Sequence, residues 1–232
     1  MKTGICDKIM KTAKVFLCFS SSVRALSVLL YIERGFPMKK NHFFAMHSRM
    51  KYINRWSLMR NTQSENISEH SNDVAAVAHA IAVIKNVRFG GTVNAERAAL
   101  LGLYHDMPEI ITGDMPTPVK YHSHAMRQEF RQVESLACEK LLSMLPEDMK
   151  PYYEDCFFPR QEDEYLWRIV KAADKISALI KCIEEQNAGN REFDAALEST
   201  KEAVRKLSLP EADAFVDEFI PSFFLSLDEQ NQ

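Results

Sequence analysis

The chain has 232 residues and a net charge of −3, so no general electrostatic footprint for nucleic acid or an anionic membrane surface is present. Its five cysteines are odd in number and widely scattered, which excludes a disulfide framework and a cysteine-based zinc site and favours a cytoplasmic location. With 46% hydrophobic residues, 7 Gly and 9 Pro, the composition suits one globular domain with a sizeable core.

The first 37 residues differ from the rest of the chain. Several lysines precede an apolar stretch, Val15–Ile32, which imitates a secretory signal. Serines interrupt that stretch, and Arg24 would be costly in a membrane-spanning helix. We therefore interpret residues 1–37 as an N-terminal extension and residues 38–232 as the domain. Two origins of the extension stay open: a start assigned too far upstream, and a weak signal-like segment.

Apolar residues recur at helical spacing through the remaining chain, without a convincing run of alternating strand residues. The sequence therefore predicts an all-α fold. Capping residues and helix breakers give the approximate limits of each helix. We expect helices over residues 42–53, 69–86, 95–104, a short one from 108, then 125–144, 162–187, 193–207 and 211–219, with an irregular aromatic loop at 151–159.

His70 falls at the beginning of the second predicted helix. Asn66 or Ser68 is the expected cap, and an apolar helical period follows. His70 should therefore lie in or near the first turn. Taken alone, a histidine at such a position is more often a capping or surface residue than a ligand.

The pair His105-Asp106 closes the apolar helix 95–104. Pro108 follows, and proline is acceptable in the first turn of a new helix but poor inside an old one. Both residues are therefore expected at a helix break, where side chains can converge on an ion. Glu109 lies three residues after Asp106 and can share its face. The dipeptide alone arises too often by chance to carry weight.

Asp174 is predicted to lie in the middle of the long helix 162–187, at the margin of its apolar face. A carboxylate in that position needs a partner, because burying a bare charge is costly. An ion pair with Lys171 or Lys175 is the simpler account of Asp174 alone.

Together, His70, His105, Asp106 and Asp174 offer two imidazoles and two carboxylates for one divalent metal ion. This donor set suits Co²⁺ or Mn²⁺ better than Ca²⁺, with Cu²⁺ and Zn²⁺ as alternatives. A metal in a helical cage can neutralise phosphate charge and activate water, so the predicted chemistry is hydrolysis of a phosphate ester. Glu109, one turn from the ligands, is the natural general acid or base.

Longer motifs surround these residues. They are Ile53–Asn61, Glu65–Ser71, Tyr104–Asp106, Glu109, Thr112–Lys120, Ala173-Asp174 and Ile220–Glu229. On these segments the chain resembles the HD-domain metal-dependent phosphohydrolases, and more closely the bacterial 5′-deoxynucleotidases of that superfamily. The resemblance runs from about Met38 to the C-terminus. It implies an HD-domain helical bundle in a single domain, a homodimer, and hydrolysis of deoxyribonucleoside 5′-monophosphates to deoxyribonucleoside and phosphate.

The resemblance also implies roles for individual residues. The family's counterpart of Glu109 is the acid or base, and Arg55 would bind the phosphate and assist catalysis, since a guanidinium matches phosphate oxygens. Trp56 would press against the sugar where a 2′-hydroxyl would sit. Without the metal motif, Arg55-Trp56 would be interpreted as a surface cation beside a packing residue. The remaining substrate contacts would come from His70, Asp106, Asp114, Met115, Pro116, Thr117 and Asp174.

Two other classes stay open. Another HD hydrolase, such as a dNTP triphosphohydrolase or a cyclic-nucleotide phosphodiesterase, would use the same ligands. Against these, the chain is short and lacks an evident basic cluster for three phosphates. A non-catalytic nucleotide-binding HD protein would have no need of an acid at Glu109. Neither nucleic acid nor a membrane is an expected partner.

Overall fold

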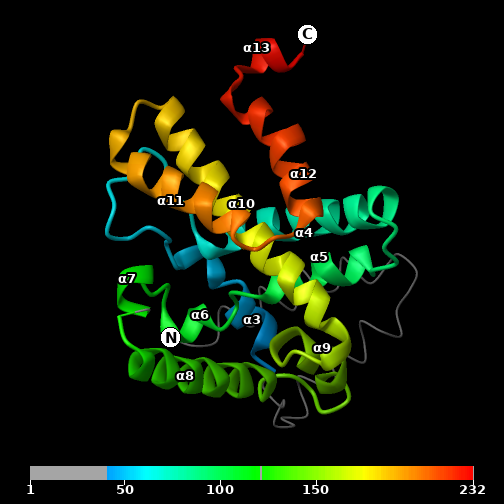
Figure 1. The fold of residues 1–232 in the computed structure, drawn as a ribbon. Helices are drawn as coiled ribbons and strands as arrows, with labels where there is room; N and C mark the ends of the chain where they lie inside the picture. Colours follow the sequence, from blue (N-terminus) through cyan, green and yellow to red (C-terminus); the bar gives the residue numbers. More distant parts are fainter. Residues whose placement is uncertain (1–40, 121, 232) are drawn as a thin grey trace, which may run out of the picture. The chain divides into compact units, whose positions relative to one another are not determined.

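The computed structural model describes residues 41–120 and 122–231, which are built from helices and short connections (Figure 1). Within these residues there is no strand, only an isolated antiparallel bridge between Asn54 and Asn66. The predicted all-α fold is confirmed. In the same part of the chain, no helix combines the length and apolar character that crossing a membrane requires. The proposed extension, residues 1–37, lies outside the described residues.

Short 3-10 helices (η) separate some of the α-helices along the chain. In order they are α3 (Phe43–His47), η1 (Met50–Tyr52), α4 (Ile67–Arg88), α5 (Ala95–Tyr104), α6 (Glu109–Thr112), α7 (Thr117–Lys120), α8 (His124–Leu142), α9 (Lys150–Phe157), η2 (Gln161–Asp163), α10 (Glu164–Asn187), η3 (Arg191–Phe193), α11 (Asp194–Arg205), α12 (Pro210–Phe219), η4 (Ile220–Phe224) and α13 (Leu227–Gln230).

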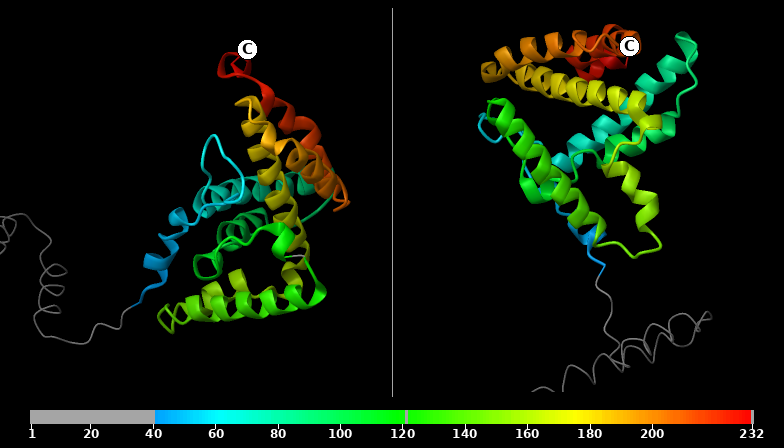
Figure 2. Two further views of the ribbon diagram at one scale, coloured as in Figure 1. Left: turned by 90° about the vertical axis from the view of Figure 1, so that its left-hand side faces the viewer. Right: turned by 60° about the horizontal axis from the view of Figure 1, so that its bottom comes forward.

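The two long helices α4 and α10 cross in the middle of the bundle (Figures 1 and 2). Helix α5 packs against both of them, α11 lies along α10, and α12 lies against α4. Burial of the facing apolar side chains removes them from water, which is the dominant favourable contribution to folding. Fully buried members of this core are Val74, Ala78, Ile81, Ile169, Ala173 and Ile176.

Helices α4 and α5 run antiparallel and approach closely at Gly102. A Cβ at this position would lie 2.9 Å from the Cα of Ala75, so a residue with a side chain would push the two backbones apart. Helix α4 begins where α5 ends. His70 in the first turn of α4 is therefore brought beside the His105-Asp106 pair that follows α5.

The prediction of an irregular loop at 151–159 is wrong, because most of this segment forms α9. Pro151 lies at the beginning of the helix, where its missing N–H is not needed. Phe157 is buried, and the Tyr153 ring centroid lies 5.1 Å from that of Phe43 on α3. Contacts with residues distant in the sequence therefore stabilise α9.

The helix expected over residues 42–53 is interrupted. Helix α3 ends at His47, and the 3-10 helix η1 follows. In η1 the Tyr52 N–H donates to the Arg49 carbonyl, three residues earlier, at 2.9 Å. Ile53 adopts an extended backbone that leads directly into the bridge between Asn54 and Asn66. The chain must leave the helix here to form that pairing.

A chain that begins at Met38 is expected to keep the fold and the hydrolytic activity predicted from the sequence. Every proposed site residue and both apolar clusters of the described chain lie after this position. Circular dichroism melting should give a Tm within about 4 °C of the full-length chain, a shift that corresponds to roughly 1 kcal/mol or less. A truncated chain that aggregates or melts without cooperativity would show that residues 1–37 belong to the fold.

Candidate active site

A capping box fixes the beginning of α4 and with it His70. The Asn66 side chain accepts hydrogen bonds from the N–H groups of Ser68 and Glu69 at 3.0 and 3.1 Å. The Glu69 carboxylate accepts in turn from the Asn66 N–H at 3.2 Å. Of the two expected caps, Asn66 is therefore the one that the chain uses. His70 follows in the first turn and is completely buried.

His70, His105 and Asp106 converge on one point. Each offers a ligand atom, and the three atoms lie within 4.8 Å of one another. Asp106 Oδ2 is central, at 3.1 Å from His105 Nε2 and 3.4 Å from His70 Nε2. Asp174 lies beside this group, with Oδ1 at 3.3 Å from His70 Nε2. The structure thus brings together all four residues that the sequence predicts as ligands.

The histidine nitrogens of this cluster fit a metal ion. Both Nε2 atoms are buried, and each faces carboxylate oxygens of the cluster, Asp106 for His105 and Asp106 with Asp174 for His70. His105 Nδ1 lies 2.7 Å from the Gly102 carbonyl, so it carries the proton and leaves Nε2 with a free lone pair. His70 Nδ1 lies 3.0 Å from Ser177 Oγ, which can accept a hydrogen bond from a protonated Nδ1. The arrangement of His105 is typical of histidines that hold a divalent cation.

Arg55 competes for the same nitrogen of His70. Its Nη1 lies 2.6 Å from Nδ1, and a guanidinium can only donate. A proton on Nδ1 would oppose that contact. A cation held by Nε2 would favour the contact of Nδ1 with Ser177 and would leave Arg55 able to donate to another acceptor.

Asp174 is interpreted from the sequence either as an ion-pair partner of a neighbouring lysine or as a metal ligand, and its two carboxylate oxygens have different neighbours. Its Oδ2 accepts from Lys175 Nζ at 3.0 Å, which is one of the expected ion pairs. Its Oδ1 faces His70 and lies 3.9 Å from Arg55 Nη2. The ion pair and the place beside the ligand cluster therefore exist together.

The cluster holds its carboxylates in the ionised form. Burial alone would raise the pKa of Asp106, but His105 and His70 hold it well below its usual value. Burial would likewise raise the pKa of Asp174, and His70 and Lys175 outweigh it in the lowering direction. Because metal ligands must be deprotonated, both carboxylates are in the state that binds a cation.

Glu109 has the opposite electrostatic setting. It begins α6, and its N–H donates to the Asp106 carbonyl at 3.0 Å. Its Oε2 is buried without a hydrogen-bond partner among the described residues. Burial raises the pKa of this carboxyl to about 9, and the charges of Asp106 and Asp114 add to the shift. A carboxyl kept neutral in this way can donate a proton.

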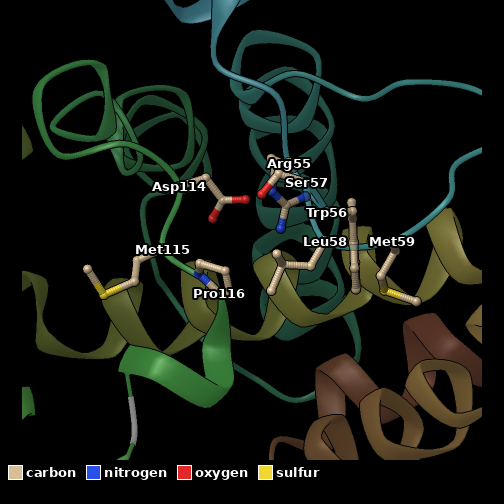
Figure 3. Close-up of a pocket in the computed structure, with 8 residues that line it drawn as sticks. All are labelled: Arg55, Trp56, Ser57, Leu58, Met59, Asp114, Met115 and Pro116. Atoms are coloured by element: carbon tan, nitrogen blue, oxygen red, sulfur yellow. The ribbon is translucent and has the colours of Figure 1, made fainter.

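A cavity of about 240 Å³ opens next to the cluster (Figure 3). Its lining residues are Arg55, Trp56, Ser57, Leu58, Met59, Asp114, Met115 and Pro116. The figure shows the Asp114 carboxylate pointing toward the Arg55 guanidinium across the cavity. Thr117, the last residue of the predicted pocket loop, begins α7 directly after Pro116. Of the residues that the sequence assigns to the substrate pocket, Arg55, Trp56, Asp114, Met115 and Pro116 line this cavity.

Comparisons with known proteins identify the family. The model of the YfbR-like 5′-deoxynucleotidases matches residues 42–223. The chain is 50% identical over 192 residues to a 5′-deoxynucleotidase of Vibrio vulnificus, covering 83% of this chain and 99% of that protein. It is also 50% identical over 198 residues to the 5′-deoxynucleotidase YfbR of Escherichia coli, covering 84% of this chain and 98% of that one. The chain belongs to the YfbR-like 5′-deoxynucleotidase family. The predicted family and enzyme class are thereby confirmed.

Solved structures confirm the predicted HD-domain bundle. An HD-domain phosphohydrolase of Listeria innocua superposes with a TM-score of 0.69 at 21% identity, covering 82% of this chain and 92% of that one. The HD phosphohydrolase DatZ of cyanophage S-2L, bound to dA and one catalytic Zn²⁺, superposes with a TM-score of 0.56 at 17% identity, covering 77% and 95%. At these identities the likeness shows the fold alone.

Two residues of this YfbR-like site were given no role from the sequence. Ser177 contacts His70 Nδ1 and lies three residues after Asp174, so the helical period places it on the same face of α10. That spacing was a usable signal. Glu65 accepts hydrogen bonds from both Arg55 and Trp56. No local pattern predicts this, because the chain must fold back between residues 56 and 65 to bring the groups together.

Proposed function

We propose that this YfbR-like protein hydrolyses deoxyribonucleoside 5′-monophosphates at one divalent cation held by His70, His105, Asp106 and Asp174. The observation that carries the proposal is the convergence of two buried Nε2 atoms on two ionised carboxylates. The names of the 50%-identical relatives support the substrate class. A homodimer and a cytoplasmic location, expected from the sequence, belong to the same proposal.

The bound cation would supply charge neutralisation at the phosphate and an activated water. The donor set of two nitrogens and two oxygens favours Co²⁺ or Mn²⁺. Zn²⁺ and Cu²⁺ are the alternatives, and the Zn²⁺ of the cyanophage phosphohydrolase supports the first of them.

Two side chains of the protein would act on the phosphate. Arg55, released from His70, would donate to the phosphate oxygens as a planar fork. Glu109, neutral in its buried setting, would give its proton to the 5′-oxygen of the leaving deoxyribonucleoside. Arg55 would meet the substrate from the irregular segment between η1 and α4, and Glu109 from the beginning of α6.

The cavity would hold the sugar and the base. Trp56 forms one wall, and Asp114, Met115 and Pro116 form the other side, with Thr117 following at the beginning of α7. The proline stiffens this segment because its φ is fixed. A 2′-hydroxyl pressed against the Trp56 ring would lose water without gaining a partner, which costs roughly 1–3 kcal/mol. This cost disfavours ribonucleotides.

The substrate class can be tested by comparing phosphate release from dAMP, dATP and cyclic AMP with added Co²⁺. We expect release of inorganic phosphate from dAMP, with dATP and cyclic AMP turned over far more slowly. Triphosphate release from dATP, or AMP formation from cyclic AMP, at rates above that for dAMP would identify another HD hydrolase. Binding of dAMP without any turnover would identify a non-catalytic nucleotide-binding protein.

Trp56→Ala is expected to narrow the dAMP/AMP ratio of kcat/KM by about 10-fold or more, on the order of 1.4 kcal/mol. The smaller side chain leaves room for the hydroxyl and its water, and it also holds the deoxyribose less firmly. Steady-state kinetics on both nucleotides measure the ratio. Trp167→Ala is the matched control, because Trp167 does not line the cavity. Equal losses on dAMP and AMP would make Trp56 a packing residue.

A further inference from the structure

We propose that Glu65 is a positioning residue that fixes the phosphate-binding Arg55 and the sugar wall Trp56 relative to each other. This inference rests on the proposed function of those two residues. A single oxygen, Glu65 Oε2, accepts from Arg55 Nη1 at 2.9 Å and from Trp56 Nε1 at 2.9 Å. The Glu65 side chain is almost completely buried, so water does not compete for this acceptor.

The backbone brings Glu65 opposite Arg55 independently of the side chains. The Arg55 N–H donates to the Glu65 carbonyl at 2.9 Å, next to the bridge between Asn54 and Asn66. Between these points the chain forms a closed loop, and Asn61 Nδ2 donates to the Trp56 carbonyl at 3.2 Å. The loop therefore sets the position of the Glu65 backbone. The Glu65 carboxylate in turn sets the positions of the Arg55 guanidinium and the Trp56 indole.

Trp56 needs such a restraint. Its φ is +57°, in the left-handed region that a bulky residue rarely adopts. On one side its ring packs against Phe193, with centroids 5.4 Å apart. On its polar edge, the hydrogen bond to Glu65 holds the indole at one rotation about the side-chain bonds. Without that bond, Phe193 restrains the ring by contact alone.

Further acids lie near Arg55, and Asp114 among them also has a hydrogen bond with the Trp56 backbone, but the Glu65 carboxylate joins the side chains of both residues. Asp174 Oδ1 lies 3.9 Å from Nη2, a longer contact than the 2.9 Å to Glu65. The Arg55 guanidinium carbon lies 5.8 Å from the centre of the Trp56 ring. Glu65 thus couples the position of the phosphate to the position of the wall that excludes a 2′-hydroxyl. Loss of this link should affect sugar discrimination as well as rate.

The test uses Glu65→Ala and Glu65→Gln in the full-length, metal-loaded protein, with dAMP and AMP as substrates. Glu65→Ala should narrow the dAMP/AMP ratio of kcat/KM by about 5-fold or more. Glu65→Gln keeps an acceptor oxygen, so it should narrow this dAMP/AMP ratio less than Glu65→Ala does. Asp163→Asn is the matched control: Asp163 is another buried carboxylate, paired with Arg97 Nη2 at 2.8 Å outside the cavity. It should lower Tm and leave the ratio within about 2-fold.

A second measurement does not depend on turnover. The chain contains 2 Trp, so in a Trp167→Phe background the fluorescence reports Trp56 alone. Removing the Glu65 carboxylate should lower the fluorescence anisotropy and shift the emission to the red, because the indole gains freedom and water. If both Glu65 variants keep the wild-type ratio and emission, the inference is overturned. If the wild type does not hydrolyse dAMP, the proposed function fails, while the fluorescence result still decides whether Glu65 positions Trp56. Should Glu65→Ala not fold, Glu65→Leu, which fills the space without an acceptor oxygen, decides both readouts.

Discussion

Asp106→Ala is expected to abolish hydrolysis of dAMP, with a loss of kcat/KM of at least about 10³-fold. Asp106 Oδ2 is the atom that both imidazoles share, at 3.1 Å from His105 Nε2 and 3.4 Å from His70 Nε2. The substitution removes a ligand and leaves the two nitrogens without the negative charge that lies between them. Phosphate release and metal content by elemental analysis measure the two effects separately.

His70→Ala, His105→Ala and Asp174→Ala should each have the same consequence, as should removal of the metal by a chelator. Asp148→Ala is a suitable control, because Asp148 is exposed on the connection after α8. It should keep wild-type activity and metal content. Full activity of chelator-treated Asp106→Ala would contradict the assignment of these residues as ligands.

Glu109→Ala is expected to lower kcat by roughly 10²–10⁴-fold, the usual contribution of a positioned acid or base. Metal content and the KM for dAMP should stay close to those of the wild type, since Glu109 lies beside the ligand cluster and is not one of its four members. Its buried Oε2 has no hydrogen-bond partner among the described residues. This oxygen can therefore form a hydrogen bond with a substrate group that enters the site. Steady-state kinetics on dAMP measure the loss.

Glu109→Gln separates proton transfer from packing. The amide fills the same space but cannot act as the acid, so it should be nearly as slow as Glu109→Ala. Recovery of wild-type kcat in Glu109→Gln would show that shape alone matters at this position. An unchanged kcat in both variants would remove Glu109 from the chemistry.

The proximity of the four proposed ligands could be predicted from the sequence because three of them lie at helix boundaries. His70 follows a cap at the beginning of α4, and the His105-Asp106 pair follows the apolar period of α5. The close approach of α5 to α4 at Gly102 and Ala75 brings those ends together. Asp174 lies in the middle of α10, at the margin of its apolar face. This side of α10 faces His70 at the beginning of α4.

Other features depend on contacts that no sequence window contains. Helix α9 is stabilised by packing of its aromatic side chains against Phe43, more than a hundred positions earlier. The positive φ of Trp56 depends on the folding back of the chain from Asn54 to Asn66. Glu65 acquires its two donors only through that same loop. These are the places where tertiary structure, and not local propensity, determines the conformation.

The central claim is that hydrolysis depends on one cation in the cluster of His70, His105, Asp106 and Asp174. Chelator-stripped wild-type protein titrated with Co²⁺, with phosphate release from dAMP recorded at each addition, tests it most directly. The predicted result is no activity in the stripped protein and a rise that reaches its plateau at one ion per chain. Undiminished phosphate release from fully stripped protein would contradict it.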